Sequence, residues 1–186
     1  MNRELDHAAR ALAGTRGFSA EERRAVIDLL RAVSRRDGGA DEHRAGLLSR
    51  LADRDFVWPE FDQWQAFFAE RGAFPPLWEH VRAAPSRQAS AEACAAYRVG
   101  KLALLLDWLH GLESSRNALA GYARRGIRAA VAKQDEGSHC PVCAPFHNRE
   151  ATDSPGHLPP FHPGCRCLLV AVSTPRPVRR LLPRSA

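Results

Sequence analysis

Two short proline-containing turns near the C-terminus constrain the fold of this chain more than any other feature of its sequence. Residues 140–143 read Cys-Pro-Val-Cys, and residues 162–165 read His-Pro-Gly-Cys. Each turn therefore holds a soft ligand, a proline, one further residue and a cysteine. Two such turns at this separation are typical of paired zinc knuckles, so we expect them to meet around one metal ion.

The chemistry of these side chains predicts a closed zinc site. A Cys-x2-Cys turn lets two thiolates reach one ion, and its proline restricts the first backbone dihedral. Gly164 permits a positive φ in the second turn. Sulfur ligands favour zinc over magnesium or calcium, and four protein ligands around zinc are typical of a structural site. The alternatives are disulfides, which need an oxidising compartment, and a redox dithiol, which is typical of a βαβ context.

Five side chains compete for the four positions around one zinc ion. The candidates are Cys140, Cys143, His162, Cys165 and Cys167. The matching turns favour the set Cys140, Cys143, His162 and Cys165. Because Cys165 and Cys167 lie two residues apart, both would point to the same face of an extended strand. In the rival set, Cys167 replaces His162, which then supports the ligands without binding the metal.

The other polar residues near the turns predict no catalytic site. The zinc deaminase pattern needs a His-x-Glu sequence upstream of Pro-Cys-x-x-Cys, and the chain has none. Four protein ligands also leave no position for a reactive water. We therefore expect exposed loop histidines at His139, His147 and His157, and loop carboxylates at Glu136, Glu150 and Asp153.

The whole stretch from residue 135 to residue 172 resembles the C-terminal part of a known family. It combines Cys-Pro-x-Cys, a loop ending in Pro-Pro-Phe, then His-Pro-Gly-Cys-Arg-Cys and an aliphatic strand. This pattern resembles the phage Mu F-like head morphogenesis family, the minor head proteins of tailed phages and prophages, and the five candidates match its signature. Asn148 stands where the family commonly has glycine, and asparagine tolerates the left-handed conformation. The resemblance implies head assembly beside capsid or portal proteins, without catalysis, in the bacterial cytoplasm or the virion.

The charge of the chain leaves a second function open. The formal net charge is +6, and a basic surface favours polyanionic partners such as DNA. A zinc-stabilised nucleic-acid-binding protein would use a basic helix and the C-terminal tail, through Arg124, Arg125, Arg128, Arg179 and Arg180. A third possibility is a metal-dependent or dithiol enzyme, which requires an open metal position or a reversible Cys140–Cys143 disulfide.

Hydrophobic periodicity predicts a mainly α fold, in which a helical domain precedes a small C-terminal zinc-stapled β/loop module. We divide the chain into a helical region 1–134, with a sub-boundary near residue 85, a zinc-knuckle module 135–172 and a basic Pro/Arg tail 173–186, extended or disordered in isolation.

A capping box opens the second helix, and a strand is expected at 168–172. Helices are expected at 4–13, from Ser19 to residues 37–39, from Asp41, from Pro59 to Gly72, from Ser90 to a stop at Gly111, and at 113–133.

Two further features concern the core and the location of the chain. Aromatic residues recur at helical spacing between Phe56 and Trp78, which is more typical of a core than of a partner surface. Cys94 falls in an apolar helical stripe and is expected to be buried and to bind no metal. The sequence contains neither a leader-like apolar segment at its start nor a run of eighteen apolar residues, so we expect an intracellular location and no membrane span.

Overall fold

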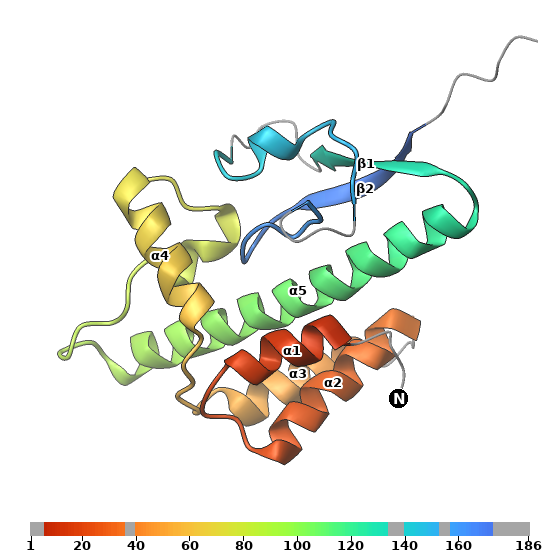
Figure 1. Cartoon of the computed structure of the whole chain (residues 1–186). Helices are drawn as coiled ribbons and strands as arrows, with labels where there is room; N and C mark the ends of the chain where they lie inside the picture. Colours follow the sequence, from red (N-terminus) through yellow and green to blue (C-terminus); the bar gives the residue numbers. More distant parts are fainter. Residues whose placement is uncertain (1–5, 36–39, 134–139, 153–156, 173–186) are drawn as a thin grey trace, which may run out of the picture.

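The computed structural model of this chain is mainly helical, with one small sheet near the C-terminus (Figure 1), as predicted. It describes residues 6–35, 40–133, 140–152 and 157–172. The elements follow in the order α1 (Asp6–Gly14), α2 (Ala20–Arg35), α3 (Ala40–Leu51), α4 (Pro59–Arg71), the 3-10 helix η2 (Pro76–Val81), α5 (Ala91–Arg124), β1 (Arg128–Lys133), the 3-10 helix η3 (Ala144–Phe146) and β2 (Cys167–Val172).

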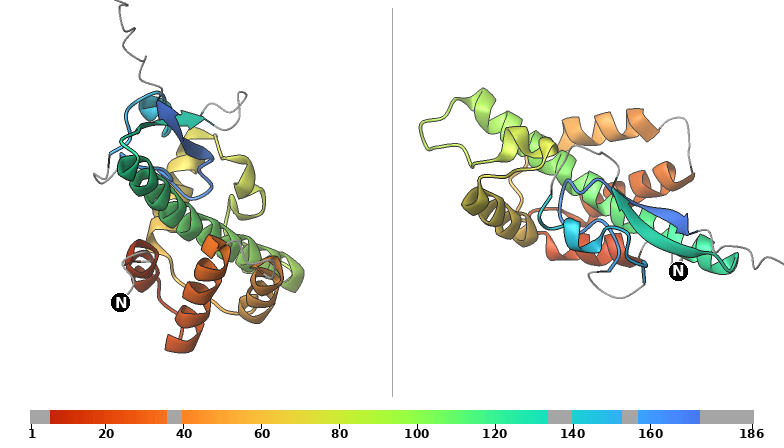
Figure 2. Two further views of the ribbon diagram at one scale, coloured as in Figure 1. Left: turned by 90° about the vertical axis from the view of Figure 1, so that its right-hand side faces the viewer. Right: turned by 90° about the horizontal axis from the view of Figure 1, so that it is seen from above.

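Helix α5 runs through the middle of the molecule and separates two layers. Helices α1, α2 and α3 pack on one side of it, whereas the sheet and the loops that carry the cysteines lie on the other (Figures 1 and 2). The helix begins at Ser90, whose side chain accepts a hydrogen bond from the Ala93 N–H. Because both layers cover its middle, Leu102, Leu104, Leu105, Leu106 and Leu109 are all buried.

The predicted helix end at Gly111 is wrong, because α5 continues through this residue to Arg124. A Cβ atom at position 111 would lie 3.0 Å from Cγ of Pro160, in the loop that carries the second proline-containing turn. The missing side chain therefore allows a close approach between the helix and this loop. A glycine in a helical pattern is compatible with either role, and the packing partner is remote in sequence.

The predicted helix over residues 113–133 is also wrong in its second half. Gly126 has a φ of +64° and reverses the chain after α5, and β1 then pairs with β2 in antiparallel register, with Val131 opposite Leu169. Ala129, Ala130 and Val131 on β1 are all buried, so burial on this strand does not simply alternate. Arg128 and Lys133 consequently belong to β1 and do not extend a basic face of the preceding helix.

The N-terminal layer and the aromatic core agree with the sequence pattern. The Ser19 N–H donates to Glu22 Oε2 at 2.7 Å, and the Glu22 N–H donates to Ser19 Oγ at 3.2 Å, which completes the capping box. Helix α4 begins at a proline and ends before Gly72, whose φ is +61°. The aromatic side chains Trp58, Phe61, Phe68 and Trp78 are fully buried, and the rings of Phe61 and Trp78 stack at 4.9 Å.

The boundaries drawn near residues 85, 134 and 172 stay predictions. Pairing of β1 with β2 joins strands on the two sides of residue 134, and residues 173–186 lie outside the described part of the chain. None of the described helices combines the length and the hydropathy needed to cross a membrane.

Candidate metal centre

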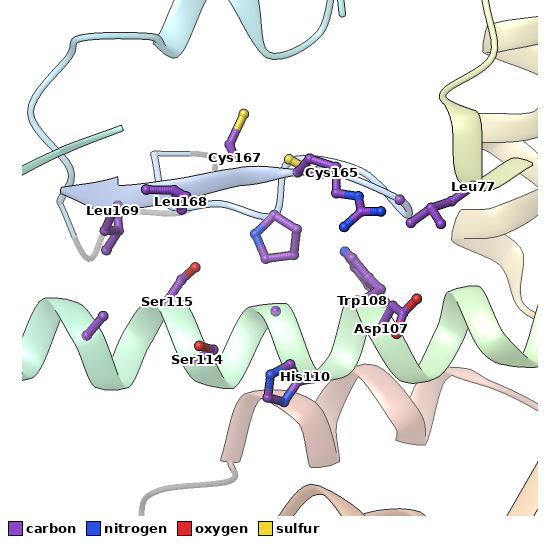
Figure 3. A pocket seen from close by; sticks show the side chains of 15 residues that line it. Leu77, Asp107, Trp108, His110, Ser114, Ser115, Cys165, Cys167, Leu168 and Leu169 are labelled. Atoms are coloured by element: carbon purple, nitrogen blue, oxygen red, sulfur yellow. The ribbon is translucent and has the colours of Figure 1, made fainter. Parts of the chain in front are cut away.

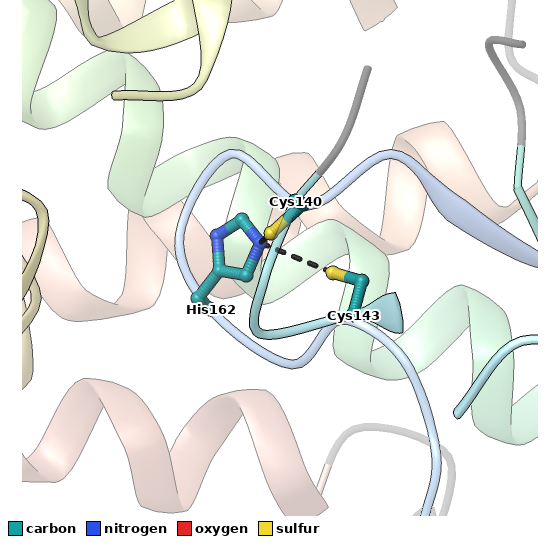
Figure 4. Close-up of side chains that lie close together, drawn as sticks. All are labelled: Cys140, Cys143 and His162. Atoms are coloured by element: carbon teal, nitrogen blue, oxygen red, sulfur yellow. Dashed lines mark hydrogen bonds between the residues drawn. The ribbon is translucent and has the colours of Figure 1, made fainter. Parts of the chain in front are cut away.

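The fold brings the two proline-containing turns together on one side of α5. In Figure 4 the imidazole of His162 faces the sulfur atoms of Cys140 and Cys143. The Sγ atoms of Cys140 and Cys143 each lie 3.2 Å from Nε2 of His162. The Sγ atom of Cys165 lies 3.6 Å from that of Cys143. The four residues of the favoured ligand set thus occupy one cluster.

The candidate ligand atoms form two groups that share Cys143. One group contains Cys140, Cys143 and His162, and the other contains Cys143, Cys165 and Cys167. Within each group all ligand atoms lie within 4.8 Å of one another. The structure therefore brings all five sequence candidates together and could hold a metal ion there. Which four of them surround one ion stays a prediction.

The spacing of these atoms fits a tetrahedral ion with sulfur and nitrogen ligands. Bond lengths of about 2.3 Å for Zn–S and about 2.0 Å for Zn–N place sulfur about 3.5 Å from nitrogen and about 3.8 Å from a second sulfur. The observed separations of 3.2 Å for Cys143 to His162 and 3.6 Å for Cys143 to Cys165 are a few tenths of an ångström shorter. These two separations are thus close to those between neighbouring ligands of one ion, although Cys165 is grouped with Cys143 and Cys167 and not with Cys140 and His162.

Local backbone structure explains why each turn presents its donors inward. The Ala144 N–H donates to the Cys140 carbonyl at 3.0 Å, and the Cys165 N–H donates to the His162 carbonyl at 3.1 Å, so both turns are closed. Gly164 has the positive φ expected for it, at +76°. Asn148 has a φ of +62°, which confirms that this position needs a residue that tolerates the left-handed conformation.

The aromatic core packs against the ring of His162. This side chain is only 2% exposed, and its ring lies 5.3 Å from that of Phe68. Nδ1 of His162 lies 2.8 Å from the Pro163 carbonyl, and when it donates a proton there, Nε2 keeps a lone pair for a metal. The indole N–H of Trp78 donates to the same carbonyl at 2.9 Å. The second turn is thus bound directly to the helical core.

Hydrogen bonds within the cluster distribute its protons unevenly. A hydrogen bond from Cys143 lowers the pKa of Cys140 to about 4, although burial opposes the shift. Hydrogen bonds from Cys143 and Cys167 lower the pKa of Cys165 to about 2, again against burial. Donation to Cys140 and Cys165 raises the pKa of Cys143. These hydrogen bonds thus favour the thiolate form of Cys140 and Cys165 and the thiol form of Cys143.

The pKa of His162 reflects the balance between burial and these thiolates. Burial disfavours the imidazolium and lowers the pKa, but the hydrogen bond to Cys140 and the charges of Cys165 and Cys140 outweigh it. The net effect is a raised pKa.

His147 is the residue that the sequence interpretation missed. It was expected to be an exposed loop histidine, but it is half-buried, and its Nε2 lies 3.4 Å from Sγ of Cys167. The 3-10 helix η3 carries the chain from Cys143 to this position. A histidine four residues after a ligand cysteine was the available signal. His157 is exposed as expected, and His139 lies outside the described residues.

The other candidates that the structure describes belong to neither ligand group. Cys94 is half-buried on α5 and belongs to neither group of ligands in the described chain. The carboxylate of Glu150 accepts two hydrogen bonds from the exposed side chain of Arg128. Arg124 and Arg125 are exposed at the C-terminal end of α5. Glu136, Asp153, Arg179 and Arg180 lie outside the described residues, and nucleic-acid contacts by any of these arginines stay a prediction.

A groove of about 430 Å³ borders the cluster between α5 and β2 (Figure 3). From α5 it is lined by Trp108, Ser114 and Ser115, and from the opposite wall by Cys165 and Cys167. Burial lowers the pKa of His110, which also lines the groove. Leu77 of η2 also lines the groove, and the hydroxyl group of Ser115 points from α5 toward β2, whereas the sulfur atom of Cys167 lies on the side of β2 away from α5 (Figure 3).

Comparisons of the chain with protein-family models, with curated proteins and with solved structures find no match.

Proposed function

We propose that this chain is a non-catalytic structural protein of phage or prophage head assembly, whose C-terminal turns are held together by a zinc ion. The observation that carries the proposal is the meeting of Cys140, Cys143 and His162, with Cys165 next to Cys143. The same residues make up the signature that resembles the head morphogenesis family. The convergence supports a metal-clamped turn pair, and the resemblance supports the biological setting.

Zinc would supply folding free energy that this part of the chain lacks. Among the described residues, the buried members of the apolar cluster under the sheet are Ala129, Val131 and Ala151, all of them small or medium-sized. Isolated structural zinc modules gain on the order of 10 kcal/mol from the metal. The ion would also hold the second turn against Trp78 and Phe68, and so connect the loops to the helical core.

The arrangement of ligands favours structure over catalysis. Four protein ligands fill a tetrahedral ion and leave no site for substrate or water. Glu150, a carboxylate close to the turns in sequence, is paired with Arg128. This side chain is therefore not available as a general base, and the cluster is suited to holding the two turns together around a metal ion.

The groove beside Cys165 and Cys167 favours one competing function, a metal-dependent enzyme with an open coordination position. Cobalt substitution separates the two functions, because the visible spectrum of Co²⁺ responds to its ligands. A structural site predicts a tetrahedral thiolate spectrum that added azide leaves unchanged. A spectrum that shifts on azide binding would favour the enzyme.

A surface for protein partners is available next to the clamp. The apolar side chains of Leu168, Val170 and Val172 on β2 are each more than a third exposed, as is Leu77 at the end of the groove. Exposed apolar side chains that gather in this way are typical of interaction sites. By the family resemblance, the partners are capsid or portal proteins.

The setting is tested by the gene neighbourhood and by the particles themselves. We expect portal, terminase and head protease genes beside the gene for this chain. We also expect peptides of the chain in purified heads or proheads, detected by mass spectrometry. A gene that lies apart from phage genes, together with particles that lack the chain, would contradict the proposal.

A further inference from the structure

The cluster contains more donors than one zinc ion can use. Five cysteine and histidine ligands fall into two groups that overlap at Cys143. A sixth donor, His147, lies 3.4 Å from Cys167. A single tetrahedral ion takes four ligands, so a one-ion site would leave a thiol and an imidazole in contact beside it without a metal.

The second group has the composition of a complete zinc site. Cys143, Cys165 and Cys167 lie within 4.8 Å of one another, and His147 extends this group from the side of Cys167. Together they supply three sulfur atoms and one imidazole nitrogen, the same donor set as the first site with Cys140, His162, Cys143 and Cys165. Combined with Cys143 and Cys165, either Cys140 with His162 or Cys167 with His147 gives three sulfur atoms and one imidazole nitrogen.

We propose that the cluster binds two zinc ions, with Cys143 and Cys165 shared between them, Cys140 and His162 completing one ion, and His147 and Cys167 completing the other. The inference rests on the proposed zinc clamp and specifies its composition. Each ion then has four protein ligands.

The distance between the shared sulfur atoms fits this role. Two tetrahedral ions that share a pair of thiolates share one edge of their coordination tetrahedra, and that edge is about 3.8 Å long when Zn–S is about 2.3 Å. The Sγ atoms of Cys143 and Cys165 lie 3.6 Å apart. Cys143 is also the residue common to both groups, and it is 2% exposed at the centre of the cluster.

Charge balance favours the second ion. One zinc ion with three thiolates and one imidazole carries a net negative charge, in a site where Cys143 and His162 are buried. An uncompensated charge in such surroundings is costly. Two zinc ions with four thiolates and two neutral imidazoles carry no net charge. The pair of ions therefore neutralises the cluster and gives His147 and Cys167 a metal to bind.

Native mass spectrometry and elemental analysis of the purified full chain test the inference. We expect two zinc ions per chain for the wild type. At a chelator concentration that leaves two zinc ions on the wild type, His147→Ala should lose the ion bound by Cys167. It should keep the ion bound by Cys140 and His162. His157→Ala is the matched control, because it removes an exposed histidine from the neighbouring loop and should keep both ions.

Cadmium substitution followed by ¹¹³Cd NMR provides a readout that does not depend on the variants. Two resonances in the thiolate region, coupled to each other through shared sulfur atoms, are expected for the wild type. One zinc ion per wild-type chain and a single resonance would overturn the two-ion inference and leave the zinc clamp intact. A chain that binds no zinc would contradict both.

Discussion

Replacement of Gly164 by alanine tests the connection between the metal centre and the helical core. Gly164 has a φ of +76°, and a Cβ atom there would lie 3.0 Å from Nε1 and 3.2 Å from Cδ1 of Trp78. The left-handed conformation alone costs an alanine about 1–2 kcal/mol. Overpacking against a buried indole adds about 1–3 kcal/mol. We therefore expect Gly164→Ala to destabilise the protein by about 2–5 kcal/mol.

Gly126→Ala is the matched control for this substitution. Gly126 has a φ of +64°, but a Cβ atom there would meet no atom within 4 Å. This variant should pay only the conformational cost of about 1–2 kcal/mol. It lies in the turn between α5 and β1, away from the ligands, so its zinc affinity should match that of the wild type.

The two variants are compared by denaturant unfolding and by competition for zinc with a chromophoric chelator. A clash of about 1–3 kcal/mol at Gly164 corresponds to a zinc affinity about fivefold to 150-fold weaker, since 1.4 kcal/mol is a factor of ten. Equal stability losses in the two variants, with zinc affinity unchanged in Gly164→Ala, would refute the packing of the second turn on Trp78.

Four further predictions follow from the same geometry. Cys143→Ser should release the metal, because Cys143 belongs to both ligand groups; unchanged zinc content by mass spectrometry would contradict this. Cys94→Ala should keep the wild-type zinc content, because Cys94 lies on α5 outside both groups, and lost zinc would show that it is a ligand. Trp78→Phe should lower the free energy of unfolding by about 1 kcal/mol more than Trp58→Phe. The indole N–H of Trp78 donates to the Pro163 carbonyl, whereas the buried indole N–H of Trp58 has no partner among the described residues. Equal losses in the two variants would argue against the Trp78–Pro163 hydrogen bond. Zinc affinity should rise with pH: the pKa of Cys143 is raised, so this thiol releases a proton on binding, and acid opposes that release. Calorimetry in buffers of different ionisation enthalpy measures the number of protons released on zinc binding. The titrations cover about pH 6 to 8, where histidine and thiol ligands change protonation. A zinc affinity that is independent of pH over this range would contradict the prediction.

The features that could be predicted from sequence are those encoded within a few neighbouring residues. The capping box of Ser19 and Glu22, the proline at the start of α4 and the positive φ of Gly164 each depend on local backbone chemistry. The aromatic residues of α4 also reveal their burial by their periodicity. The convergence of the two metal-binding turns could be anticipated because donor type and spacing constrain it chemically.

The features that could not be predicted depend on partners remote in sequence. Gly111 looks like a helix end until Pro160 is seen against it. Val131 continues an apolar helical pattern, and only its pairing with Leu169 makes it part of a strand. His147 looked like a loop histidine because nothing local places Cys167 beside it. In each case a contact between distant segments overrides a local pattern that allowed two structures.

Zinc-edge X-ray absorption of the purified full chain tests the central claim most directly. The account predicts bound zinc with a shell dominated by sulfur at about 2.3 Å and a smaller nitrogen contribution at about 2.0 Å. Loss of zinc on purification, or a shell of oxygen and nitrogen without sulfur, would contradict a metal clamp built from these cysteines.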